Sequence, residues 1–114
     1  MLTFEDIVPM LCIPVAQQDY DLIVEAAAGD SEAQNNLALL FLDADKPGLG
    51  LHWLTLAADQ GHPDAMHHLS KLYIQGSGIP KNDNLGLMWL SKAAALGHVI
   101  AGEQVTALTR FRKA

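Results

Sequence analysis

Apolar residues recur along most of this chain at intervals of three and four positions, which is the spacing of one face of an α-helix. Glycine, proline, asparagine and aspartate separate the periodic stretches and mark turns between them. The pattern predicts an all-α chain whose successive helices form antiparallel pairs. The expected helices cover about residues 14–28, 31–43, 48–60, 64–75, 83–96 and 99–113, with a short additional one over residues 4–8.

Two stretches of the chain carry the same pattern at an offset of 36 residues. Residues 50–65 read GLHWLTLAADQGHPDA, and residues 86–101 read GLMWLSKAAALGHVIA. Their identical positions are Gly50/Gly86, Leu51/Leu87, Trp53/Trp89, Leu54/Leu90, Ala57/Ala93, Ala58/Ala94, Gly61/Gly97, His62/His98 and Ala65/Ala101. Such self-similarity indicates a repeat array, in which each unit buries its apolar face by stacking on its neighbour.

The turns contain the stop and start signals of helices. In the stretch Gly61–Asp64, glycine suits a left-handed helix exit, proline suits the first helical position, and aspartate suits the positive helix end. His62 and His98 follow equivalent glycines, which indicates that both act as caps. Asp30 is expected to cap helix 31–43, and Asn82 or Asp83 to cap helix 83–96.

Small and large residues at equivalent positions predict how the helices pack. A glycine inside a helix costs roughly 1 kcal/mol relative to alanine, so Gly50 and Gly86 suggest that a close approach requires them. Burying a tryptophan stabilises a fold by about 4–6 kcal/mol. Trp53 and Trp89 are therefore expected to fill equivalent wedges between successive helix pairs.

These residues, taken together, resemble the Sel1-like repeat family, which is close to the tetratricopeptide repeats. One copy of the family pattern consists of Ala65, Leu69, Tyr73, Gly76, Gly78, Ile79, Asn82, Gly86, Trp89, Ala93, Ala94 and Gly97. A second copy consists of Ala33, Leu37, Phe41, Gly50, Trp53, Ala57, Ala58 and Gly61. The resemblance implies a right-handed α/α superhelix, a short solenoid that acts as an interaction scaffold or adaptor and needs no catalytic residues or cofactor.

The repeat frame divides one domain, residues 1–114, into four parts. Residues 1–29 form an N-terminal cap and a degenerate half-repeat, in which Leu11, Cys12 and Ile13 are expected to pack as a hydrophobic lid. Residues 30–61 form the first repeat and residues 62–97 the second. Residues 98–114 form a C-terminal capping helix.

Charge and composition narrow the class of partner. The net charge is −6, and no lysine or arginine precedes Lys46, which argues against nucleic-acid binding because phosphates require a basic face. No apolar run approaches the roughly 20 residues that span a bilayer, so no membrane partner is expected. A single cysteine, Cys12, excludes an intrachain disulfide and favours the cytoplasm.

The best candidate interaction surface is the side of helices 31–43, 64–75 and 99–113 that lies opposite their core stripe. It is expected to be solvent-exposed and to bind a peptide or helix of another protein. Its residues are Asn35, Leu39, Leu42, His67, Ser70, Lys71, Ile74, Glu103, Thr106 and Arg110. The alternative is that the apolar members pack against the N-terminal lid or a second protomer, giving a homodimer.

A second hypothesis assigns ligand binding, metal binding or catalysis to the histidines. His62, Asp64, His67 and His68 lie within seven residues. However, neighbouring helical residues point about 100° apart, so His67 and His68 cannot both face one ion well. Capping and solvated histidines are the simpler interpretation. The sequence therefore predicts a non-enzymatic interaction module without a metal site.

Overall fold

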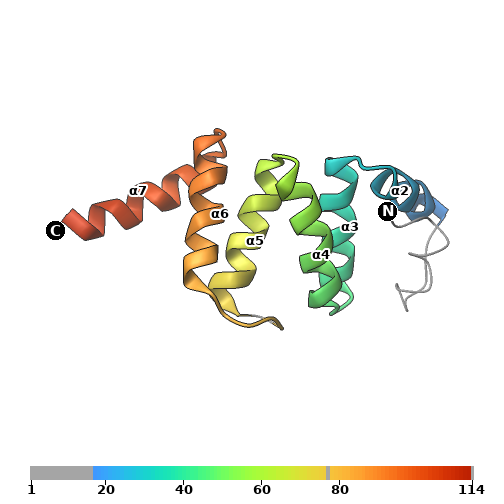
Figure 1. Cartoon of the computed structure of the whole chain (residues 1–114), viewed down its shortest axis with the longest axis horizontal. Helices are drawn as coiled ribbons and strands as arrows, with labels where there is room; N and C mark the ends of the chain where they lie inside the picture. Colours follow the sequence, from blue (N-terminus) through green and yellow to red (C-terminus); the bar gives the residue numbers. More distant parts are fainter. Residues whose placement is uncertain (1–16, 77, 114) are drawn as a thin grey trace.

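The computed structural model describes residues 17–76 and 78–113, and for residues 17–19 and 109–113 it describes the backbone alone. The predictions of a helix over residues 4–8 and of a lid containing Cys12 lie outside the described residues. Within the described ranges the helices follow one another in a single row (Figure 1). They are α2 (Gln17–Ala27), α3 (Ser31–Asp43), α4 (Pro47–Asp59), α5 (Pro63–Gln75), α6 (Asp83–Ala95) and α7 (Val99–Lys113).

The helices form antiparallel pairs stacked side by side, so the molecule is elongated, 53 × 25 × 22 Å. α3 pairs with α4 and α5 pairs with α6, while α2 packs on α3 and α7 packs on α6. α7 points away from the row at its C-terminal end (Figure 1). The expected all-α solenoid of antiparallel helix pairs is confirmed.

Side chains at the helix starts explain where the elements begin. The backbone N–H of Ala33 donates to Asp30 Oδ1 at 3.0 Å, and that of Leu85 donates to Asn82 Oδ1 at 3.1 Å. These bonds satisfy amides that have no partner in the first helical turn. Asp30 therefore caps α3 as predicted, and Asn82 rather than Asp83 caps α6.

One continuous core runs through the row. Helices α3 and α5 contribute the same stripe, in which Leu37 and Leu69 are completely buried. Helix α4 contributes Leu54 and the pair Ala57–Ala58, and α6 contributes Leu90 and the pair Ala93–Ala94. The buried residues at this interface include Ala33, Phe41, Trp53, Leu54, Ala57, Ala58, Ala65, Leu72, Leu90 and Ala93. Burial of these repeat positions confirms that each pair is stabilised by stacking on its neighbour.

Gly50 and Gly86 allow the paired helices to approach closely. A Cβ atom at Gly50 would lie 2.6 Å from Leu42 Cδ2, and one at Gly86 would lie 2.5 Å from Ile74 Cγ1. Carbon atoms in contact are about 3.5–4.0 Å apart, so neither site has room for a methyl group. The packing explanation for both glycines is confirmed.

Two expectations about burial are wrong. Trp53 is fully buried, but Trp89 is only partly buried because α6 lies nearer the end of the row. The Nζ of Lys92 lies over the Trp89 ring, 4.9 Å from its centroid. The helical spacing of Ala101, Val105 and Leu108 predicts that all three lie in the core stripe of α7, yet Leu108 is 46% exposed. Within the described residues no helix follows α7 to cover it.

Candidate functional site

The structure separates the predicted interaction residues into buried, partly buried and exposed groups. Asn35, His67 and Ser70 are buried, so the expectation that they face solvent is wrong. Leu39, Leu42 and Ile74 are partly buried, and Lys71, Glu103 and Thr106 are exposed. Arg110 lies in α7, and its side chain is outside the described part of the structure. Whether any of these residues binds a partner stays a prediction.

Neighbouring helices bury the polar members of the set. Ser70 is 1% exposed and its hydroxyl donates to the carbonyl oxygen of His67 at 2.7 Å. The Nε2 of His67 lies 3.0 Å from Gln104 Oε1, across the gap between α5 and α7. Among the described residues, the buried Oδ1 of Asn35 has no hydrogen-bond partner. Sequence spacing placed these side chains opposite the core stripe, but it could not show that the next helix also covers that side.

The apolar members Leu42 and Ile74 already have a structural role. Both pack where their own helix meets the glycine of its paired helix, Gly50 for Leu42 and Gly86 for Ile74. Their side chains therefore belong partly to the hairpin interface. A substitution at either position would disturb folding as well as any binding surface.

Part of the predicted surface nevertheless lines a hollow between α5, α6 and α7. Its volume is about 410 Å³. The lining residues are Ser70, Lys71, Ile74, Gln75, Leu90, Gln104, Ala107 and Leu108. Three of them, Ser70, Lys71 and Ile74, were predicted from the sequence. Gln75, Leu90, Gln104, Ala107 and Leu108 were missed because they come from other faces or helices, which only the angle between α6 and α7 brings together.

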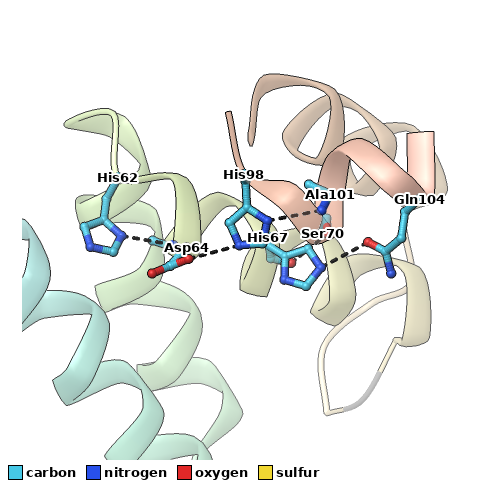
Figure 2. Close-up of polar contacts among 8 residues, drawn as sticks. His62, Asp64, His67, Ser70, His98, Ala101 and Gln104 are labelled. Carbon is cyan, nitrogen blue, oxygen red and sulfur yellow. Dashed lines mark hydrogen bonds and ion pairs between the residues drawn. The ribbon is translucent and has the colours of Figure 1, made fainter. Parts of the chain in front are cut away.

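Histidines connect α5 to α7 next to this hollow (Figure 2). The ring of His67 stacks on that of His98, with centroids 4.6 Å apart and planes 26° apart. His98 Nδ1 accepts the backbone N–H of Ala101 at 3.1 Å, and His98 Nε2 lies 3.0 Å from Asp64 Oδ1. A ring nitrogen that accepts a hydrogen bond from an N–H carries no proton itself, so the proton of His98 lies on Nε2. This Nε2–H donates a hydrogen bond to Asp64 Oδ1. One ring thus caps α7 and links it to the start of α5.

Burial disfavours charge on two of these histidines. Desolvation lowers the pKa of His67 below its ordinary value of 6.5, and the hydrogen bond to Gln104 acts in the opposite direction. Desolvation also lowers the pKa of His68, with Lys71 adding a smaller effect in the same direction. Both rings are therefore favoured in the neutral form inside the fold.

The histidines act mainly as structural groups. The Nδ1 of His62 accepts the N–H of Ala65 at 3.2 Å, so His62 caps α5 as His98 caps α7. The capping role predicted from their shared position is confirmed. Nitrogens engaged in this way are not free to bind a metal ion. Among the described residues, no group of three or more histidine, cysteine, aspartate or glutamate side chains is arranged to hold one.

A second cavity, of about 540 Å³, lies where α2, α3 and α4 meet. It is lined by Ala26, Ala27, Gly29, Gln34, His52, Trp53, Leu56 and Gln60. Gln60 Nε2 donates to Gln34 Oε1 at 2.8 Å, and Gln34 Nε2 donates to the carbonyl oxygen of Ala26 at 3.2 Å. No sequence pattern indicates this cavity, because Gln34 and Gln60 belong to no recognisable motif.

The comparisons with known proteins agree with the repeat geometry. The family model described as Sel1 repeat matches residues 31–62 and 63–98, which is more than half of the chain. The chain belongs to the Sel1 repeat family. Each matched segment contains one antiparallel pair, α3 with α4 and α5 with α6. Sel1 repeat domains are generally protein-interaction modules.

A solved structure shows the same arrangement. The crystal structure of a Sel1 repeat protein from Oxalobacter formigenes is 31% identical in sequence, with a TM-score of 0.68. The alignment covers 75% of this chain and 68% of that one. No curated protein matched the chain. Within the described residues, no helix of this Sel1 repeat protein has the length and apolar character needed to cross a membrane.

Proposed function

We propose that this Sel1 repeat chain is a non-enzymatic adaptor that binds a peptide or helix of another protein in the hollow between α5, α6 and α7. The observation that carries the proposal is the mixture of groups in that hollow. Ile74 and Leu108 supply apolar contact, and the exposed cation of Lys71 lies at the same hollow. A few polar groups among apolar ones are typical of surfaces that bind one partner in one orientation.

Flanking segments are part of the proposal. α7 is proposed as a C-terminal cap, because the positions matching Ala38/Ser70 and Leu42/Ile74 in the paired helices are Thr106 and Arg110. Polar residues at these positions suit a helix that has no paired helix to cover it. A cytoplasmic location is also proposed, and the single cysteine supports it.

The experiment uses Leu108→Asp in the full chain, since this side chain is already 46% exposed and tolerates a charge better than a core residue. Val24→Asp on α2 is the matched control, because it places the same charge on an exposed apolar side chain away from the hollow. Partners would be captured by cross-linking and quantified by mass spectrometry. The proposal expects one protein to be retained by wild type and by Val24→Asp, and lost with Leu108→Asp.

Two results would contradict the proposal. The first is equal retention of all partners by Leu108→Asp and wild type. The second is a change from dimer to monomer in Leu108→Asp during sedimentation, with no partner lost. That second result would identify the hollow as a contact between copies of this chain instead.

A further inference from the structure

Two turns at the same edge of the row have the same backbone but different surfaces. The turn between α4 and α5 reads QGHPDA, residues 60–65, and the turn between α6 and α7 reads LGHVIA, residues 96–101. Gly61 and Gly97 both have φ of 90°, and the following histidine caps the next helix in both. The glycine, histidine and alanine that both turns share are therefore sufficient for this backbone.

The second turn carries apolar side chains that its backbone does not need. Leu96 is 55% exposed, Val99 is 73% exposed and Ile100 is 55% exposed. The first turn has a glutamine, a proline and an aspartate at the same positions. Proline at the first helical position and a carboxylate in the first turn both stabilise a helix start, and α7 has neither. Local folding thus favours the polar turn, and the apolar one needs another explanation.

The apolar turn borders two shallow hollows whose charged groups are acidic. The first, of about 370 Å³, is lined by His62, Pro63, Asp64, Leu96, Gly97, His98, Val99 and Ile100. The second, of about 480 Å³, is lined by Val99, Gly102, Glu103, Thr106 and Ala107. Asp64 and Glu103 are exposed, and no lysine or arginine is among the described residues that line either hollow.

We propose that the patch of Leu96, Val99 and Ile100 docks a segment of a partner protein whose apolar side chains are flanked by lysine or arginine. Exposed apolar groups beside the exposed carboxylates of Asp64 and Glu103 complement such a segment, since the apolar contact supplies affinity and the charges set its orientation. The overall charge of −6 also attracts a basic partner. None of Leu96, Val99 and Ile100 lines the hollow between α5, α6 and α7, so this inference does not depend on the proposed function.

The test rewrites the apolar turn as the polar one. The variant Leu96→Gln/Val99→Pro/Ile100→Asp changes LGHVIA to QGHPDA, a sequence that the same fold already accommodates between α4 and α5. The probe is a fluorescent helical peptide of about 15 leucine, alanine and lysine residues, compared with a counterpart containing glutamate in place of lysine. Affinity would be measured by anisotropy with the full chain in about 0.15 M salt. Val24→Gln, an exposed apolar substitution on α2, is the control.

The proposal expects binding of the lysine peptide to weaken at least ten-fold in the rewritten variant and to stay unchanged in Val24→Gln. The variant carries one additional negative charge, so non-specific attraction would strengthen instead of weakening. Should the triple variant fold poorly, Val99→Gln alone is expected to weaken binding several-fold. Glu103→Gln is also expected to weaken binding and to reduce its dependence on salt.

Three results would overturn the proposal. The rewritten variant could bind the lysine peptide as tightly as wild type or more tightly, or wild type could bind the glutamate peptide equally well. Alternatively, wild type could self-associate in sedimentation experiments while the rewritten variant stays monomeric. That outcome would assign the patch to a second copy of the chain.

Discussion

Gly50 and Gly86 show that a residue without a side chain can be the most constrained position in a helix. Each permits the side chain of the paired helix, Leu42 or Ile74, to occupy the space where a Cβ atom would stand. The backbone carbonyl oxygens of Ala38 and Ser70 would lie 3.3 and 3.1 Å from those Cβ atoms. Since a backbone moves less easily than a side-chain end, the hairpin geometry depends on the glycines.

Gly50→Ala should therefore lower the free energy of unfolding by about 1–3 kcal/mol, because overpacking outweighs the gain in helix propensity. Gly48→Ala in the same helix is the matched control, since its Cβ would have no atom within 4 Å. The control should be neutral or stabilising by up to about 1 kcal/mol. Urea unfolding measures both, and equal effects of the two substitutions would contradict the packing argument.

The two tryptophans should differ in their contribution to stability, although the repeat pattern made them equivalent. Trp53→Ala removes a fully buried indole and should cost about 3–5 kcal/mol. Trp89→Ala removes a partly buried indole and one cation–π contact with Lys92, and should cost roughly half as much. Urea unfolding of both variants measures the difference. A larger loss in Trp89→Ala than in Trp53→Ala would show that burial is not the deciding quantity.

Among the helices, α7 is held differently from the others. It packs on α6, and its link to α5 includes the bond from His67 to Gln104 and the histidine stack with His98. His98 also caps α7, so one ring contributes to both the start and the attachment of this helix. A helix held by few contacts is expected to unfold locally before the rest of the fold, so α7 should open before the repeats do.

Acidification should loosen this attachment. Burial makes the pKa of His67 and of His68 lower in the fold than the 6.5 of the unfolded chain. Below that pH the unfolded chain binds more protons than the folded one, so stability is fully present above about 6.5 and falls as the pH drops. Lys71 and His98 repel a charged His67, while Asp64 attracts it.

The measurement is the free energy of unfolding at several values between about pH 7 and 5, with hydrogen exchange reporting on α7. His67→Gln should show a shallower decline than wild type, because it removes one ring whose pKa burial lowers. If His67→Gln and wild type declined in parallel, the buried ring would not be the source of the pH dependence.

Taken as a whole, the molecule is a row of helices with unevenly distributed charge. Between residues 17 and 45 it contains acidic residues and no lysine or arginine, and the net charge is −6. The ion pair of Lys81 with Asp83 and the contact of His98 with Asp64 lie on α5, α6 and α7 or their connections. The acidic half thus has no basic side chain of its own to offset repulsion among its carboxylates.

Added salt should therefore stabilise the folded chain at neutral pH. Screening reduces carboxylate repulsion over distances beyond about 10 Å, while the exposed ion pair that salt also weakens contributes about 1 kcal/mol or less. The urea midpoint should rise when sodium chloride increases from about 0.01 to 0.2 M. Glu32→Gln should reduce that rise, and a midpoint that falls with salt in wild type would contradict the argument.

The repeat pattern was sufficient for most of the fold. Apolar spacing located every described helix to within about three residues, and the signals at Asp30, Gly61 and His62 located their ends. These features are local, since a helical period, a cap and a left-handed glycine each depend on a few neighbouring residues. The requirement for Gly50 and Gly86 could also be inferred, because both equivalent sites carry the same propensity cost.

Only the tertiary structure decided which predicted surface residues are accessible. Asn35, His67 and Ser70 are buried, and Leu108 is exposed, because burial depends on whether a helix from another part of the chain lies alongside. Likewise, the hollow between α5, α6 and α7 arises from the angle at which α7 leaves α6, which no spacing along the chain records. Periodicity specifies which faces of a helix are apolar, but the packing of all the helices determines which faces meet water.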